Sequence, residues 1–143
     1  MLRQKKPRAV LRHHRVPRPE YVLERIGRKA EQRFRKICRR FLPKEGTPPW
    51  LVNIALSTHQ EDMDGADFFA ETEEGFRIPI DVKSSKSAVY DFKKKLLQRR
   101  EDRSHVILLA VDRNTPEFEI WCRMVGDVSV KRLELLAERA ARD

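Results

Sequence analysis

The stretch GADFFAETEEGFRIPIDVK, residues 65–83, decides the fold because it predicts two strands joined by a tight turn. Apolar and polar side chains alternate through much of 66–71 and 76–83. Such alternation is typical of strands that bury one face. The Glu-Glu-Gly sequence at 73–75 separates the two runs and favours a turn. We therefore expect an antiparallel hairpin at the centre of the chain.

The segments on either side of this hairpin predict a mixed α/β (α+β) fold. Apolar residues recur at steps of three and four in the helical segments, and short apolar runs indicate the strands. In chain order we expect a helix at 20–41, a strand at 50–56, the hairpin, a helix at 91–103, strands at 105–111 and 118–122, and a helix at 130–141. The order αβββαββα predicts a mixed sheet flanked by helices.

The chain has 143 residues and a formal net charge of +9, which favours a polyanionic partner such as nucleic acid or an anionic membrane surface. Residues 1–19 are basic, contain no acid and are interrupted by prolines. We interpret them as a flexible basic arm before a single domain at 20–143. A mitochondrial transit peptide is the rival interpretation, but the prolines and missing serines disfavour the amphipathic helix it needs.

The cysteines and the hydropathy pattern predict a cytoplasmic protein. Cys38 and Cys122 match no metal-ligand spacing, so we interpret them as reduced, partly buried thiols. No apolar run approaches the roughly 18 residues of a membrane span. The N-terminus has no apolar signal-peptide segment, so we expect no membrane partner.

Two acids and one lysine are predicted to meet at one end of the hairpin. Pairing Thr72 with Phe76 and counting outward places Asp67 opposite Asp81, unless a bulge at the turn shifts the register. Strand alternation places Lys83 on the same face as Asp81. Opposed carboxylates repel each other, and Mg²⁺ relieves this by binding a few carboxylate oxygens and several waters.

Gly65-Ala66-Asp67 followed by Ile80-Asp81-Val82-Lys83 resembles the motif of the PD-(D/E)xK nuclease superfamily. This superfamily includes many restriction enzymes and the archaeal Holliday-junction resolvases. The resemblance covers about residues 20–111 and implies a restriction-endonuclease-like core, with the last strand and helix added to it. Ala66 stands where the name-giving proline would be, which is a common variation.

The resemblance also implies a Mg²⁺-dependent nuclease, in which Mn²⁺ could substitute. The implied metal ligands are Asp67, Asp81, the Val82 carbonyl and a glutamate of the first helix, either Glu31 or, as the alternative, Glu24. Lys83 would activate water or stabilise charge on the phosphate. For either glutamate, the simpler interpretation is a solvated carboxylate paired with a nearby base. Asp62, Asp64 and His59 are also more simply explained as solvated loop residues.

A basic segment after the second hairpin strand is predicted to contact nucleic-acid phosphates. Its members are Lys86, Lys93, Lys94, Lys95, Arg99, Arg100 and Arg103. The small size suits a structure-selective DNA endonuclease, such as a junction resolvase acting as a homodimer. RNA and other DNA substrates remain open. The second hypothesis is a non-catalytic nucleic-acid-binding or scaffolding protein that keeps the nuclease fold.

Overall fold

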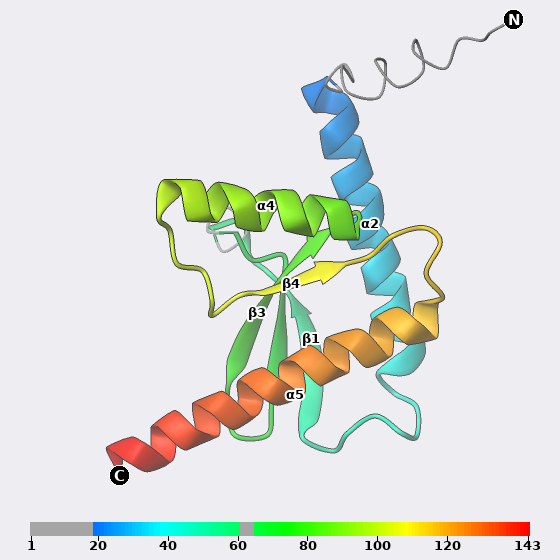
Figure 1. The fold of residues 1–143 in the computed structure, drawn as a ribbon. Coiled ribbons are helices and arrows are strands. Elements are labelled where there is room, and N and C mark those ends of the chain that lie inside the picture. The colour runs from blue at the N-terminus through cyan, green and yellow to red at the C-terminus, as the bar shows by residue number, and fades with distance from the viewer. Residues whose placement is uncertain (1–18, 61–64) are drawn as a thin grey trace, which may run out of the picture.

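The structure of the protein, a computed structural model, describes residues 19–60 and 65–143. The predicted basic arm, apart from Pro19, and the loop acids Asp62 and Asp64 lie outside these residues. The helices and strands follow one another as α2 (Glu20–Phe41), β1 (Leu51–Leu56), β2 (Phe68–Thr72), β3 (Arg77–Lys83), α4 (Lys86–Arg99), β4 (Ile107–Ala110) and α5 (Glu117–Arg142). The predicted mixed α/β class is confirmed (Figure 1).

The four strands form one mixed sheet in the order β1-β2-β3-β4. The first three strands are antiparallel neighbours, whereas β4 lies parallel to β3. Phe68 pairs with Ile80, and the backbone N–H of Thr72 donates to the carbonyl of Phe76 at 3.0 Å. These pairs follow the predicted register without a shift. Asp67 and Asp81 are the next residues outward from the first pair.

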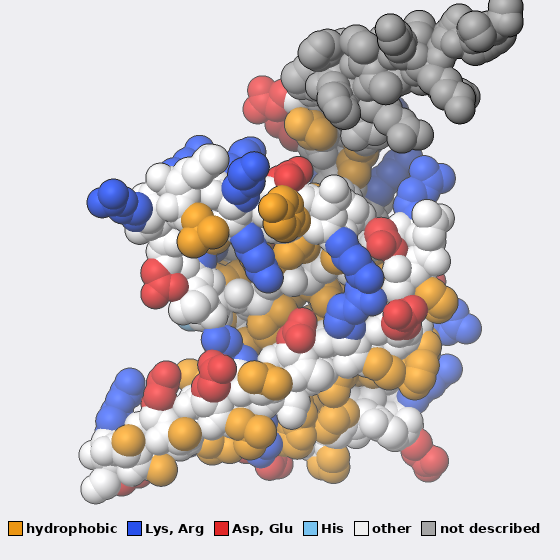
Figure 2. All heavy atoms as spheres, in the orientation of Figure 1, with side chains coloured by type: hydrophobic (Ala, Val, Ile, Leu, Met, Phe, Trp, Pro, Cys, Tyr) orange, Lys and Arg blue, Asp and Glu red, His pale blue; other side chains and the backbone are white. Residues whose placement is uncertain are grey.

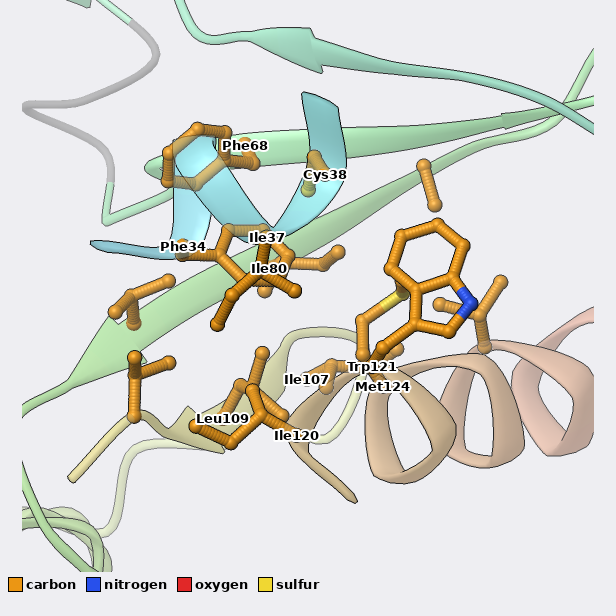
Figure 3. Packing of buried hydrophobic residues seen from close by; sticks show 14 of the residues in the cluster. Phe34, Ile37, Cys38, Phe68, Ile80, Ile107, Leu109, Ile120, Trp121 and Met124 are labelled. Atoms are coloured by element: carbon orange, nitrogen blue, oxygen red, sulfur yellow. The ribbon is translucent and has the colours of Figure 1, made fainter. Parts of the chain in front are cut away.

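The core lies between one face of the sheet and the helices α2 and α5, while α4 lies on the other face (Figure 1). Phe34 and Ile37 of α2, Ile80 and Leu109 of the sheet, and Ile120 and Met124 of α5 meet in this core (Figure 3). Each such side chain contributes about 1.5–3 kcal/mol when fully buried. Helix α4 contributes no residue to the core, so it is a cover on the opposite face.

The predicted strand at 118–122 is wrong, because this segment forms the beginning of α5. Ile120, Met124 and Val128 recur every four residues and are fully buried, which is a helical period. Phe118, in contrast, is 62% exposed. Residues 118–122 alone fit a strand as well as a helix, because the buried residues that continue the helical period lie beyond them. The observed order within the described residues is therefore αβββαβα.

Helix α4 begins at Lys86, earlier than the predicted start at residue 91, and ends at Arg99. Ser85 caps its first turn by accepting a hydrogen bond from the N–H of Ala88 at 3.0 Å. Arg100 takes a left-handed conformation (φ 57°) and ends the helix. Of the helices in the described residues, none combines the length and the apolar character that crossing a bilayer requires.

Candidate active site

Asp67 is attached to β3 through both its backbone and its side chain. Its N–H donates to the carbonyl of Ile80 at 2.9 Å, which extends the hairpin by one step beyond β2. Its Oδ2 accepts a hydrogen bond from the N–H of Val82 at 2.7 Å. A charged acceptor makes such a bond stronger than a neutral one. The carboxylate of Asp67 is therefore held next to the backbone between Asp81 and Lys83.

Asp81 and Lys83 form an ion pair on the face of the sheet that α4 covers. Lys83 Nζ lies 3.3 Å from Asp81 Oδ2, and the Asp81 residue is only 6% exposed. The same ammonium lies 4.1 Å from the ring centroid of Phe92 on α4. An aromatic face attracts a cation, so Phe92 and Asp81 together restrain the lysine head group. Sequence alternation predicted this shared face, and the ion pair confirms it.

Glu31 enters the same region from α2. A cleft of about 310 Å³ is lined by Glu31 and Asp67, together with His59 and the arginines Arg28 and Arg35. Glu24, the alternative helix acid, is exposed and does not line this cleft. Of the two candidates, Glu31 is therefore the glutamate that the fold brings to Asp67.

The predicted residues form two neighbouring pairs that meet at the Asp67–Val82 hydrogen bond. Glu31 and Asp67 share the cleft, whereas Asp81 and Lys83 lie on β3. Among residues 19–60 and 65–143, no group of three or more His, Cys, Asp or Glu side chains is arranged to hold a metal ion. Mg²⁺ usually takes only one or two protein carboxylates and keeps several waters. The hard oxygen donors of Asp67 and Asp81 fit that mode of binding.

Arg103, one of the residues predicted to bind nucleic acid, packs against Gly65, two residues before Asp67. Gly65 has φ 93°, and a Cβ added there would overlap the guanidinium of Arg103. The same guanidinium lies 5.9 Å from the ring centroid of Phe92. The glycine thus permits both the turn and the close approach of the arginine. Arg103 helps to shape the approach to the site.

The other predicted phosphate-binding residues are exposed, on α4 or directly after it. They are Lys86, Lys93, Lys94, Lys95, Arg99 and Arg100. Figure 2 shows Lys and Arg side chains spread along this helix. These charges therefore lie on the helix that covers the face of the sheet carrying Asp81 and Lys83.

Several cleft residues were not predicted as part of a site. Arg28, Arg35, Ser57, Thr58 and His59 all line the cleft with Asp67. One sequence signal was available, since Arg28 and Arg35 lie seven residues apart on the helix that carries Glu31. Comparison with protein-family models, curated proteins and solved structures finds no match to this chain. The resemblance therefore rests on the motif residues alone.

Proposed function

We propose that this protein is a metal-dependent nuclease with a restriction-endonuclease-like core that hydrolyses phosphodiester bonds in nucleic acid. The observation that carries the proposal is the hydrogen bond from the Val82 N–H to Asp67 Oδ2. This bond links the carboxylate of Asp67, the residue before β2, to the backbone of β3 between Asp81 and Lys83. Asp81 and Lys83 form an ion pair with each other. Two carboxylates at one end of a hairpin can hold Mg²⁺, and an ammonium next to them can stabilise phosphate charge, which supports Mg²⁺-assisted phosphodiester hydrolysis.

Each residue has a distinct role in this proposal. Asp67 and Asp81 would hold Mg²⁺, with the Val82 carbonyl and Glu31 as the further expected ligands. A bound ion would supply a water of lowered pKa and would neutralise charge that develops on the phosphate. Lys83 would place its ammonium against the phosphate oxygens or the attacking water. Phe92 restrains that ammonium at 4.1 Å and covers it from one side.

The finer proposal is a structure-selective DNA endonuclease. The exposed lysines and arginines of α4 support a polyanionic substrate, because phosphate contacts position a nucleic acid without reading its sequence. Cytoplasmic location and homodimer formation stay predictions from the sequence. Light scattering of the purified chain, with and without DNA, measures the oligomeric state directly.

The second candidate function is a non-catalytic protein that binds nucleic acid. The exposed lysines and arginines of α4 are compatible with it, because they would contact phosphates with or without a metal site. The Lys83–Asp81 ion pair is also compatible with it, since the two charges compensate each other without any metal. Metal dependence of cleavage separates the two functions.

The test is cleavage of duplex, branched and single-stranded DNA, and of RNA, with Mg²⁺, Mn²⁺ or EDTA. We expect cleavage that EDTA abolishes and that Asp81→Asn or Lys83→Ala removes. Asp91→Asn and Lys36→Ala are matched controls, because both residues are exposed, on α4 and α2, and neither belongs to the proposed centre or to the predicted phosphate-binding residues. Undiminished cleavage by a folded Asp81→Asn or Lys83→Ala variant would falsify the mechanism. Binding without cleavage on every substrate would favour the second function.

A further inference from the structure

A groove runs between α2 and β1 and includes the cleft of Glu31 and Asp67 at one end. Two cavities of about 310 Å³ and about 610 Å³ adjoin each other. They share Arg35, Leu56 and Phe68 in their linings, so they form one continuous groove. Asp67 lies at one end, and Pro43 lines the other part. Any chain held in the groove would therefore reach Asp67.

One wall of the groove is a row of arginines on α2. Arg28, Arg35 and Arg39 line it, at steps of seven and four residues that keep them on one side of the helix. Other arginines of the same helix have structural roles. Arg33 donates to the carbonyl of Thr115 at 2.7 Å, and Arg40 binds Glu117 at 2.9 Å. The arginine row is thus a separate set that faces the groove.

The wall opposite the arginines includes exposed apolar side chains of β1. Val52 and Leu56 of β1 are 60% and 56% exposed, although both are large hydrophobic residues. They lie on an outer strand of the sheet, because β1 pairs with β2 alone among the described strands. Cationic and apolar surfaces side by side match an unpaired nucleic-acid strand, which presents phosphates along one side and unstacked bases along the other.

A duplex matches this groove less well, because its bases are stacked inside and it offers little apolar surface. A peptide that adds a strand to β1 is the other occupant to consider. The three arginines of the opposite wall favour a polyanion over a peptide.

We propose that this groove binds one unpaired strand of nucleic acid and leads it to Asp67. The catalytic role of Asp67 in this inference rests on the proposed nuclease function. The binding of a strand in the groove does not depend on it. If both hold, the substrate class is nucleic acid with a single-stranded region, such as a flap, an end or an opened junction.

The test is fluorescence anisotropy in EDTA with a labelled oligonucleotide of about 12 nucleotides, in single-stranded and duplex form. The variant Arg28→Gln/Arg35→Gln is compared with Lys29→Gln/Lys36→Gln. Both pairs are exposed or nearly so on α2, lie seven residues apart and remove two charges, but the lysines do not line the groove. Circular dichroism checks that each variant is folded.

Each phosphate contact on a single strand contributes roughly 0.7 to the slope of log K against log salt, which is about fivefold in affinity at 0.1 M salt. We therefore expect the arginine pair to weaken single-strand binding about 25-fold and to reduce the slope by about 1.4. The lysine pair should have a much smaller effect. Equal losses for the two pairs, or a groove variant that weakens only duplex binding, would overturn the proposal.

A substitution of an apolar residue tests the wall of the groove formed by β1. Leu56→Glu places a carboxylate in the groove, and Val130→Glu is its control, since Val130 is 59% exposed on α5 and lies outside the groove. We expect only Leu56→Glu to weaken single-strand binding. Unchanged affinity would contradict the inference and favour a peptide. Because EDTA prevents metal-dependent cleavage, groove-dependent binding without any cleavage in Mg²⁺ would overturn only the nuclease proposal.

Discussion

Replacing Gly65 by alanine should destabilise the protein and displace Arg103 from the approach to Asp67. Gly65 has φ 93°, where an L-residue costs about 1–3 kcal/mol. Alanine also reduces the entropy of the unfolded chain, which offsets about 0.4–1 kcal/mol. The added Cβ would overlap the guanidinium of Arg103, but this is the end of a flexible side chain and can move away. Moving it sacrifices the contact with Phe92, worth about 0.5–1 kcal/mol.

Two other glycines separate these contributions. Gly75 has φ 87° and nothing within 4 Å of an added Cβ, so Gly75→Ala measures the backbone cost alone. Gly126 lies within α5 with open space around it, and Gly126→Ala should stabilise the protein by about 0.5–1 kcal/mol. We expect Gly65→Ala to cost more than Gly75→Ala by about 0.5–1 kcal/mol, the worth of the Arg103–Phe92 contact.

The assay is urea unfolding of the three variants and of Arg103→Ala with and without Gly65→Ala. In the Arg103→Ala background, Gly65→Ala should cost only as much as Gly75→Ala does in the wild type, because no guanidinium remains to be displaced. A coupling of about 0.5–1 kcal/mol between Gly65 and Arg103 is therefore expected. Additive effects, or a neutral Gly65→Ala, would refute the reasoning. The fold would then not depend on glycine at the entrance to Asp67.

Two further predictions concern protonation and thiol reactivity. Hydrogen bonds from Arg132 lower the pKa of Glu74 from 4.5 to about 2, so this pair stabilises the fold above pH 4.5 and its contribution is lost as the pH falls towards 2. Glu74→Gln should lower stability at neutral pH and flatten its acid dependence in thermal melts; an unchanged profile would contradict this. Burial raises the pKa of the Cys38 thiol to about 12, whereas Cys122 is exposed. Iodoacetamide should alkylate only Cys122 in the folded protein, and mass spectrometry that finds Cys38 modified at a similar rate would count against the buried thiol.

The hairpin and the positions of Asp67, Asp81 and Lys83 on it could be predicted because this geometry is local. The register of β2 and β3 depends on turn length and alternation, both visible within residues 65–83. Once the register is known, Asp67 and Asp81 are the next positions beyond Phe68 and Ile80, and Lys83 lies on the same face of β3 as Asp81. The start of α5 could not be read in the same way, because a window of five residues such as 118–122 fits both periods.

The groove and the Gly65–Arg103 contact depend on segments far apart in the sequence. Arg28 and His59 meet beside Asp67 only because α2 packs across the hairpin, and that packing is determined by core residues such as Phe34. The sequence does not show which arginines of α2 line the groove, since the helix also carries arginines that bind other parts of the protein. Arg33 and Arg28 have the same chemistry, and only the fold assigns one to the carbonyl of Thr115 and the other to the groove. A basic stripe on a helix therefore indicates a nucleic-acid surface only when the residues that bind other parts of the protein are left out of it.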